Sequence, residues 1–345
     1  MGARRPRAVD RRRPGAAGLG RPRGVIADVV RAEGAPGPTL VLDQGRLPRG
    51  ALALRGELIA VRRWLEETGR GQVRKIALVG PSPVASYDVD YRFVQCLPEP
   101  DGFDFRTGCG HSLLAAVVAS GRRGPVRVRA VTTGDPVLCL PRPDGSYTVR
   151  VERPVSVAEL LPTGRPVQRL CGLPVSLVRY GNPYVFVAAR DLGLTSRDAL
   201  FGAGAEVLGR LLAVRAAAAR LLGLPVTGAL PKVAAVGACL PGRLSVRAAT
   251  VTGWHPGLAL TGSVCLAAAR GVPGTVPWLL SEGPDRRPWA AVERVRPLRL
   301  DTPSGPVLVS AAGTGQRLAH VAVHGKRARV LERSLSLPWR IHVTA

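Results

Sequence analysis

The sequence predicts an α+β protein of two pseudo-symmetric lobes, each an antiparallel β-sheet or barrel wrapped around one central helix. Short segments of β character dominate the chain and do not alternate with helices as a βαβ repeat requires. Two short Ala-rich helices, at 110–120 and 262–272, are apolar on nearly every face, which is typical of a helix enclosed by other elements. Each follows a glycine turn and ends near a glycine and a proline. The two halves therefore look like one motif used twice, although composition alone can also make two Ala-rich helices alike.

Eight segments are predicted strands. They lie at 39–44, 75–80, 87–97, 126–134, 146–153, 173–190, 232–240 and 294–305. In YDVDYRFVQ, polar and apolar residues alternate with period two, as in a strand with one buried face. Longer amphipathic helices are expected at 57–67 and 206–224, and Gly223 and Pro225 stop the second one in the order that helix ends favour.

Residues 1–37 are expected to form a basic tail without fixed structure. The first 23 residues hold eight arginines with Gly and Pro and almost nothing to bury. An arginine-rich targeting peptide is the alternative. The N-terminal lobe is expected over 38–170 and the C-terminal lobe over 171–329, and a last strand within 330–345 is expected to return to the N-terminal lobe.

The formal net charge of +25 would by itself suggest a nucleic acid or an anionic surface as partner. Only three of the 49 basic residues are lysines, however, and the arginines are spread along the whole 345-residue chain, a bias typical of a GC-rich genome. The sequence has no zinc-ligand spacing, no helix-turn-helix pattern and only 4% aromatic residues. We therefore expect no nucleic-acid partner.

The six cysteines are far apart and form no CxxC pair. They are Cys96, Cys109, Cys139, Cys171, Cys239 and Cys265. This spacing predicts neither a disulfide framework nor a zinc site, and it favours a reducing, cytoplasmic compartment. No apolar run reaches the ~18 residues of a membrane span, so no membrane partner is expected.

The stretch FRTGCGHSLLAAVVASG (105–121) places Cys109 between two glycines, directly before a helix. A helix N-terminus offers free N–H groups and a partial positive charge, which bind a carboxylate or an enolate oxygen and stabilise a thiolate. Cys109 is therefore predicted to have a lowered pKa and to act as a general acid or base. A small buried core residue is the alternative, and it is our interpretation of the other five cysteines.

Lys75 opens the strand KIALVG after a glycine-containing loop. In a chain that uses arginine almost everywhere, a lysine indicates a position where an amine that can lose its proton matters. Lys232, in LPKVAAVG, has a similar setting in the second half. For both lysines, a solvated charge at a strand end is the alternative, and Lys326 is interpreted as a surface residue.

Three further polar residues lie near the predicted helix starts. Asn182, in a Gly-Asn-Pro turn, can satisfy its own backbone or bind a carboxylate. His255 stands six residues before Thr261, within reach of a ligand at the second glycine turn, unless it is a structural histidine. His111 follows Cys109 closely and either faces the cleft or fills the first turn of the helix.

In order along the chain, these segments resemble the 2-methylaconitate cis-trans isomerases (the PrpF type), whose fold is that of diaminopimelate epimerase and proline racemase. The segment from KIALVG to HSLLAAVVASG resembles the first half of the family. LPVSLVRYGNPYVFVAARDLGLT, LPKVAAVG, HPGLALTGSVCLAAARGVPGT and the TPSG at 302–305 follow, and KRARVLERSLSLP resembles the closing segment. The resemblance covers roughly residues 39–338.

The resemblance implies an active cleft between the lobes, proton transfer next to a carboxylate, and neither a metal nor an organic cofactor. The family's catalytic lysine falls on Lys75 and its glycine-flanked cysteine on Cys109. Abstraction of an allylic proton would give a dienolate, and its return at another carbon would move the double bond. Substrate-binding positions are expected at Gly108, Gly110, His111, Asn182, His255, Thr261, Gly262, Ser304 and Arg49.

The chain departs from the family at three places. First, the segment QGRLPRG (44–50) contains Arg49 and lacks the hydroxyl groups of the family's GGTSKG-like loop. Second, the segment GRGQVR (69–74) stands where the family has a run of small polar residues. Third, His111 stands where the family has an asparagine. Several donors for a small, multiply charged acid are therefore missing, which favours a secondary-metabolite intermediate with a carboxylate or carbonyl group as the small-molecule substrate.

We therefore expect a cytoplasmic double-bond or stereocentre isomerase, with a homodimer as one option for its assembly. The alternative is a repurposed member of the fold that acts as a cyclase or binding protein for a polyketide-like substrate. A basic nucleic-acid-associated protein is a third hypothesis.

Overall fold

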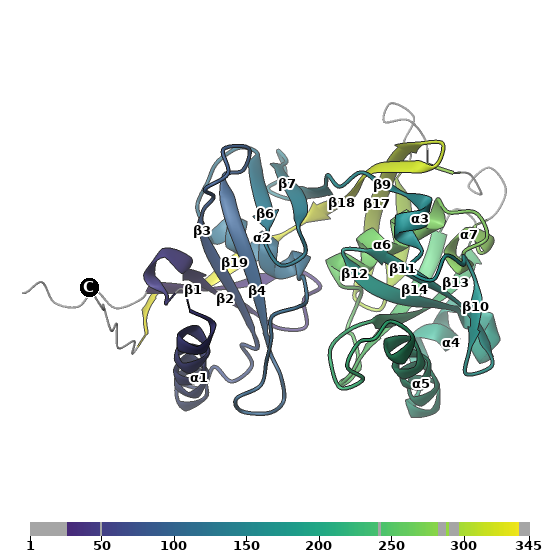
Figure 1. Cartoon of the computed structure of the whole chain (residues 1–345), viewed down its shortest axis with the longest axis horizontal. Coiled ribbons are helices and arrows are strands. Elements are labelled where there is room, and N and C mark those ends of the chain that lie inside the picture. Colours follow the sequence, from purple (N-terminus) through teal and green to yellow (C-terminus); the bar gives the residue numbers. More distant parts are fainter. Residues whose placement is uncertain (1–25, 49, 241–242, 282–287, 290–296, 338–345) are drawn as a thin grey trace, which may run out of the picture.

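The computed structural model describes residues 26–48, 50–240, 243–281, 288–289 and 297–337. It contains two lobes that lie side by side (Figure 1). The predicted tail over residues 1–25, Arg49 and the C-terminal residues after 337 lie outside the described part of the chain.

The first lobe is a sheet that wraps around helix α2 (Gly110–Ala119). Its strands are β1 (Ile26–Ala32), β2 (Thr39–Asp43), β3 (Lys75–Pro81), β4 (Val89–Cys96), β6 (Val126–Ala130), β7 (Asp135–Pro141) and β8 (Tyr147–Val151). Neighbouring strands pair in this order, and the pairs β2–β3 and β4–β6 are parallel while the others are antiparallel. Helix α1 (Ala51–Glu67) joins the first parallel pair and α2 joins the second.

The second lobe repeats this order strand for strand around helix α6 (Leu260–Arg270). Its strands are β11 (Leu173–Tyr180), β12 (Asn182–Ala188), β13 (Lys232–Leu240), β14 (Arg243–Thr250), β16 (Leu298–Thr302), β17 (Gly305–Thr314) and β18 (Arg317–Lys326). The pairs β12–β13 and β14–β16 are parallel and the others antiparallel. Helix α5 (Ala205–Leu221) takes the place of α1. The internal repeat predicted from two Ala-rich helices is thus present in the topology.

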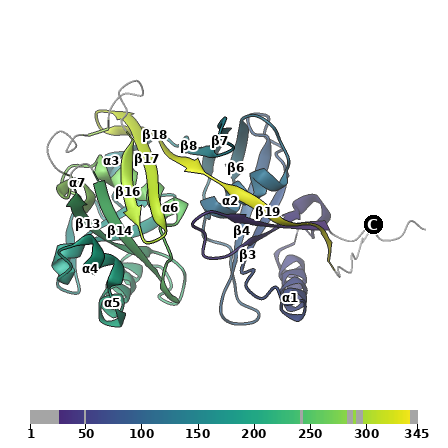
Figure 2. The ribbon, with the colours of Figure 1, turned by 180° about the vertical axis from the view of Figure 1, so that it is seen from behind.

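The C-terminal part of the chain ties the lobes together. Strand β18 pairs with β8, which joins the two sheets into one, and β19 (Ala328–Ser336) continues into the first lobe and pairs with β1 (Figure 2). The shorter elements are η1 (Gln44–Arg46), β5 (Phe103–Asp104), β9 (Val155–Ser156), α3 (Val157–Leu160), β10 (Gln168–Leu170), η2 (Ala189–Leu192), α4 (Arg197–Gly202), β15 (Gly253–Trp254) and α7 (Val276–Leu279).

Helices α1 and α5 cover the outer faces of the sheets, whereas α2 and α6 lie inside them. On α1 the buried residues Leu54, Leu58, Val61 and Leu65 recur every three or four positions, so that one stripe of the helix packs on the first sheet. On α2 every residue from His111 to Val117 is buried, as expected for a helix that is apolar all round. None of the helices in the described residues has the length and apolar character to cross a membrane.

Four expectations need correction. The sheet of each lobe, predicted to be antiparallel, is mixed, because the crossovers through α1 and α2 in the first lobe and through α5 and α6 in the second join parallel strands. Residues 26–32, assigned to the tail, form β1, because β19 and β2 supply hydrogen-bonding partners on both of its edges. Residues 155–170, assigned to the first lobe, pair with the second lobe through β9 and β10. Helix α6 begins at Leu260, two residues earlier than predicted, so that Thr261 and Gly262 lie inside its first turn.

Candidate active site

The two inner helices meet at their N-termini. A Cβ atom at Gly110 would lie 2.9 Å from Cβ and Cγ of Leu260, the first residue of α6, so only glycine permits this approach. Gly262 is explained in the same way, because a Cβ there would lie 2.7 Å from the hydroxyl oxygen of Tyr184. Gly110 and Gly262, which were predicted as substrate-binding positions, are therefore also needed for close packing of the inner helices.

Cys109 is the N-cap residue of α2 and is held by the first lobe. The Ser112 hydroxyl donates a hydrogen bond to its sulfur at 3.3 Å and lies 2.9 Å from Thr39 Oγ1. The Tyr91 hydroxyl donates to the Cys109 carbonyl oxygen at 2.8 Å. As a residue, Cys109 is partly exposed, whereas Cys96, Cys139 and Cys265 are buried as predicted. Cys171 is exposed, so its interpretation as a core residue is wrong.

Lys75 is the first residue of β3, opposite Thr39 on the neighbouring strand, and is 7% exposed. Burial lowers the pKa of its ammonium group, and the nearby Cys109 thiolate opposes that effect. For Cys109, burial alone would raise the pKa, but the charge of Lys75, the hydrogen bond from Ser112 and the charge of Lys232 together bring it below its ordinary value.

Lys75 and Cys109 thus form a coupled pair in which each charge stabilises the other. A proton can reside on the nitrogen, giving an ammonium and a thiolate, or on the sulfur, giving an amine and a thiol, and the net charge of the pair is the same in both forms. Such a pair can accept a proton at one atom and donate a proton from the other.

Asn182 connects the second lobe to the glycine turn before Cys109. Its Oδ1 accepts a hydrogen bond from the Gly108 N–H at 3.0 Å, and its Nδ2 donates to the Gly108 carbonyl oxygen at 2.9 Å. The side chain is 2% exposed. Both ends of the amide are therefore engaged with the backbone, so the structure places Asn182 as a clamp on the turn rather than in the open cavity.

A cavity of about 280 Å³ opens beside Lys75. Lys232, Arg74 and His255 line it as well, together with Gln72, Gln95, Thr252 and Trp254. Burial lowers the pKa of Lys232 and the negative charge of the Cys109 thiolate raises it, and the net result is a lowered pKa. Burial and the charges of Lys232 and Lys75 lower the pKa of His255 to about 4, and its Nδ1 accepts a hydrogen bond from the Gly257 N–H at 3.1 Å. The imidazole is therefore neutral near pH 7 in a cavity of positive charge.

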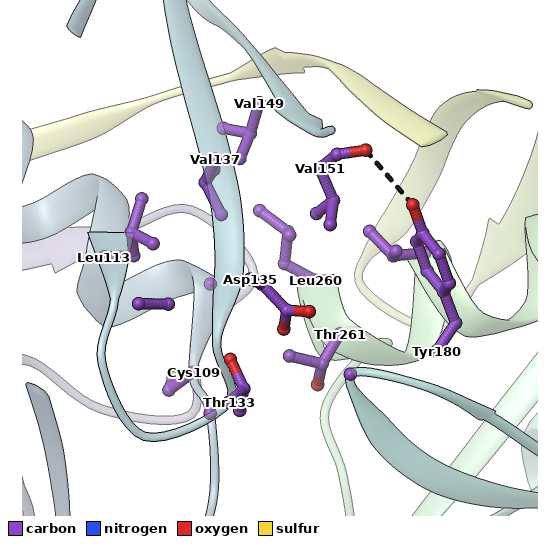
Figure 3. A pocket seen from close by; sticks show the side chains of 15 residues that line it. Cys109, Leu113, Thr133, Asp135, Val137, Val149, Val151, Tyr180, Leu260 and Thr261 are labelled. Atoms are coloured by element: carbon purple, nitrogen blue, oxygen red, sulfur yellow. Dashed lines mark hydrogen bonds between the residues drawn. The ribbon is translucent and has the colours of Figure 1, made fainter. Parts of the chain in front are cut away.

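A second, smaller pocket of about 40 Å³ lies between the N-termini of α2 and α6 (Figure 3). Its walls include Cys109, Thr261 and Asp135, together with apolar side chains such as Leu113 and Val137. Asp135 forms a salt bridge of 3.0 Å with Arg153. Cys109 thus adjoins a small, mostly apolar space that can accommodate a methyl-sized group.

A Cβ atom at Gly34 would lie 3.9 Å from both His111 Nε2 and Ser304 Oγ, and His111 is buried. Lys326 is only 9% exposed, so its interpretation as a surface residue is wrong, because β18 ends between the two lobes. Lys75 and Lys232 line the larger cavity, whereas Lys326 is buried outside its lining. Lysine is rare in this chain, and the same signal that identified Lys75 as a candidate applies equally to Lys326.

Asp135 was missed because nothing in its local sequence marks it. Among the described residues, no three His, Cys, Asp or Glu side chains gather as a metal site requires. Arg49, a predicted binding residue, lies outside the described part of the chain.

Comparison with known sequences identifies relatives of the chain. The PrpF protein family matches residues 151–334, which is more than half of the chain. A (4E)-oxalomesaconate Delta-isomerase of Novosphingobium sp. is 29% identical in an alignment of 237 residues that covers 58% of this chain and 66% of that protein. A 4-oxalomesaconate tautomerase of Pseudomonas putida is 27% identical in an alignment of 154 residues that covers 36% of this chain and 43% of that protein. The chain thus spans less than two thirds of the length of either relative.

Comparison with solved structures shows the fold. The crystal structure of a methylitaconate-delta-isomerase superposes with a TM-score of 0.63 at 19% identity, covering 90% of this chain and 94% of that one. A hydroxyproline epimerase from Agrobacterium vitis superposes with a TM-score of 0.59 at 15% identity, covering 90% and 92%. The predicted architecture of two lobes around central helices, as in diaminopimelate epimerase and proline racemase, is confirmed.

Proposed function

Because the chain belongs to the PrpF family, we propose that it is an isomerase that moves a proton between two carbon atoms of an unsaturated dicarboxylic acid. The observation that carries the proposal is the pair of Lys75 and Cys109 at the N-terminus of α2, where each group is the strongest electrostatic partner of the other. The 280 Å³ cavity beside Lys75 supplies room for a small acid.

The pair can complete the reaction without an outside reagent. The Cys109 thiolate removes a proton from one carbon, which leaves a thiol and a carbanion delocalised onto the conjugated carboxylate. The Lys75 ammonium then donates a proton to a second carbon and becomes an amine. Transfer of the proton from the thiol to the amine restores the starting pair. The positive charges of Lys232 and the α2 N-terminus stabilise the delocalised anion.

The cavity favours a substrate with more than one negative charge. Lys75, Lys232 and Arg74 line it, and the lining residues that the structure describes include no Asp or Glu. The expectation of a less charged secondary-metabolite intermediate came from the missing hydroxyl donors, and it remains a prediction that this excess of cations does not support. The cytoplasmic location and the homodimer likewise remain predictions.

The experiment is to incubate the protein in deuterated water with the acids named for its relatives, oxalomesaconate and methylitaconate, and to follow deuterium in the product by NMR. We expect deuterium at the carbon that receives the proton, because both Lys75 and Cys109 exchange their protons with solvent. The Cys109→Ala and Lys75→Met variants should leave the label out.

Two results would contradict the proposal. In the first, the folded wild-type protein incorporates deuterium into none of the acids, and the acids do not protect Cys109 from alkylation either. The other is product formation without label in the wild type, which is the behaviour of a cyclase that closes a ring without proton transfer.

A further inference from the structure

His255 lies in the wall of the 280 Å³ cavity beside Lys75, and the proton-transfer chemistry does not use it. The residue is 7% exposed, and its Nδ1 atom accepts a hydrogen bond of 3.1 Å from the Gly257 N–H. A backbone N–H is always a donor, so Nδ1 carries no proton. The imidazole is therefore neutral, and its single proton is on Nε2.

The turn that follows His255 holds the ring in one orientation. The His255 N–H donates a hydrogen bond of 2.9 Å to the Ala248 carbonyl oxygen, which ties the residue to β14. Gly257 packs closely on Ser304, because a Cβ atom at Gly257 would lie 3.2 Å from Ser304 Cβ. Within the described residues, the Nε2 atom of His255 has no hydrogen-bond partner. Nε2 is therefore the ring atom that can donate to a molecule in the cavity.

The cations around the cavity keep this donor neutral. Burial, followed by the charges of Lys232 and Lys75, lowers the pKa of His255 to about 4, so the ring carries no charge near pH 7. The carboxylates of a bound acid have Lys75, Lys232 and Arg74 in the same cavity as charged partners. A neutral N–H donor beside three cations suits an oxygen that accepts a hydrogen bond without a net charge, which is a carbonyl oxygen.

We propose that the Nε2–H group of His255 donates a hydrogen bond to a keto oxygen of the substrate, so that the cavity selects a keto dicarboxylic acid over a dicarboxylic acid without that oxygen. The inference rests on the proposed function and narrows its substrate class. When a proton leaves the carbon next to a keto group, negative charge develops on the keto oxygen, and a fixed N–H donor stabilises that charge. Nε2 keeps its proton throughout, so the exchange between Lys75 and Cys109 is unchanged.

The test measures binding of acids that have no carbon–carbon double bond, so that it is independent of turnover. The probes are 2-oxoglutarate and freshly dissolved 3-oxoglutarate, each compared with glutarate, which has the same chain length and the same charge but no keto oxygen. Titration calorimetry at pH 7.5 gives Kd for each acid and the full-length protein.

Two variants separate the donor from the turn. In His255→Gln, the side-chain amide extends as far as Nε2 and can donate into the cavity. In His255→Asn, the shorter amide offers an oxygen near the position of Nδ1, which can accept from Gly257, but it does not reach the position of Nε2. The matched control is His320→Asn, because His320 is a partly buried histidine of β18 that does not line the cavity.

We expect the wild type to bind at least one keto acid about 5-fold more tightly than glutarate. His255→Asn should lose this preference and bind glutarate within about 2-fold of the wild type, because glutarate does not use the donor. His255→Gln and His320→Asn should keep the preference within about 2-fold of its wild-type value.

Three results would overturn the proposal. In the first, the wild type binds the keto acids and glutarate equally well. In the second, the preference persists in His255→Asn, which would assign the keto oxygen to one of the cations. In the third, the preference persists in His255→Asn and is lost in His255→Gln, as expected of a histidine that only holds the turn.

If His255→Asn does not fold, NMR of the wild type labelled with ¹⁵N-histidine replaces it. The keto acid should shift the Nε2 resonance of His255 and glutarate should not, whereas equal shifts would overturn the proposal. The deuterium experiment depends on none of these results, so failure of the keto selection is distinguishable from failure of the isomerase proposal.

Discussion

Asn182 and Gly108 exchange two hydrogen bonds between the lobes: the amide oxygen of Asn182 accepts from the Gly108 N–H, and the amide nitrogen donates to the Gly108 carbonyl oxygen. Gly108 immediately precedes Cys109, so the second lobe sets the position of a thiol that belongs to the first. The site is thus held in place by a contact across the boundary between the lobes.

Asn182→Ala should lower activity without removing a reacting group. Loss of two buried hydrogen bonds should reduce the free energy of unfolding by about 2 kcal/mol, and a misplaced thiol should reduce kcat about 10-fold or more. Denaturant unfolding and steady-state kinetics measure the two effects. An unchanged kcat in the destabilised protein would mean that the clamp serves stability alone.

Cys109→Ala should abolish isomerisation and leave the fold intact. Removal of a general acid–base group typically costs about 10²–10⁴-fold in rate, and Cys109 as a residue is only partly buried, so little packing is lost. Turnover is measured with the acids named above and folding by circular dichroism. Cys171→Ala is the matched control because Cys171 is exposed and belongs to a turn after β10. Activity in Cys109→Ala equal to that of the control would remove the thiol from the mechanism.

Lys75→Met should raise the pKa of the Cys109 thiol. Burial raises this pKa, and the Lys75 charge is the largest influence that lowers it again. In the wild type, Cys109 should therefore react with iodoacetamide below the ~8.5 of a free thiol, and in the variant the reaction should require a higher pH. Peptide-level mass spectrometry measures the labelling rate against pH. Lys75→Arg, which keeps the charge, is the control, and overlapping profiles for wild type and Lys75→Met would disprove the coupling.

Gly110→Ala should destabilise the contact between the inner helices, and a second substitution that shortens the Leu260 side chain should relieve part of the clash. The new Cβ would collide with the Leu260 side chain, and overpacking of this kind costs about 1–3 kcal/mol. In the double variant with Leu260→Ala, the two changes should be less destabilising than the sum of the single ones. Thermal unfolding of all four proteins measures the coupling, and strict additivity would show that the helices can move apart.

His255→Gln should make the protein less sensitive to acid. The pKa of His255 is about 4 in the folded protein and near 6.5 in the unfolded chain. As the pH falls below 6.5 the unfolded chain takes up the proton first, so stability is lost between pH 6.5 and 4, by about 3 kcal/mol in total. Glutamine does not titrate, so this part of the loss should vanish in denaturant titrations at pH 7.5 and 4.5. Equal losses in variant and wild type would show that His255 is not the group responsible.

Local pattern was enough to predict the inner helices, the glycine turn around Cys109 and the repeat of the two halves. Each depends on neighbours in the chain: an apolar helix has to be enclosed, and a cysteine at a helix N-terminus meets the same field in any fold. The exact start of α6 was not predicted, and Gly262 in its first turn packs against Tyr184 of β12, a contact that only the folded chain makes.

The sequence by itself determined which groups are available: three lysines among 49 basic residues, a cysteine in a glycine turn and an asparagine between two strands. Only the tertiary structure decided which of them meet. Lys326 is buried because β18 leaves the second lobe and ends against the first, and Asn182 reaches Gly108 across 74 residues of chain. Contacts over such separations are chosen by the packing of whole sheets around α2 and α6, and no local period in the sequence records that choice.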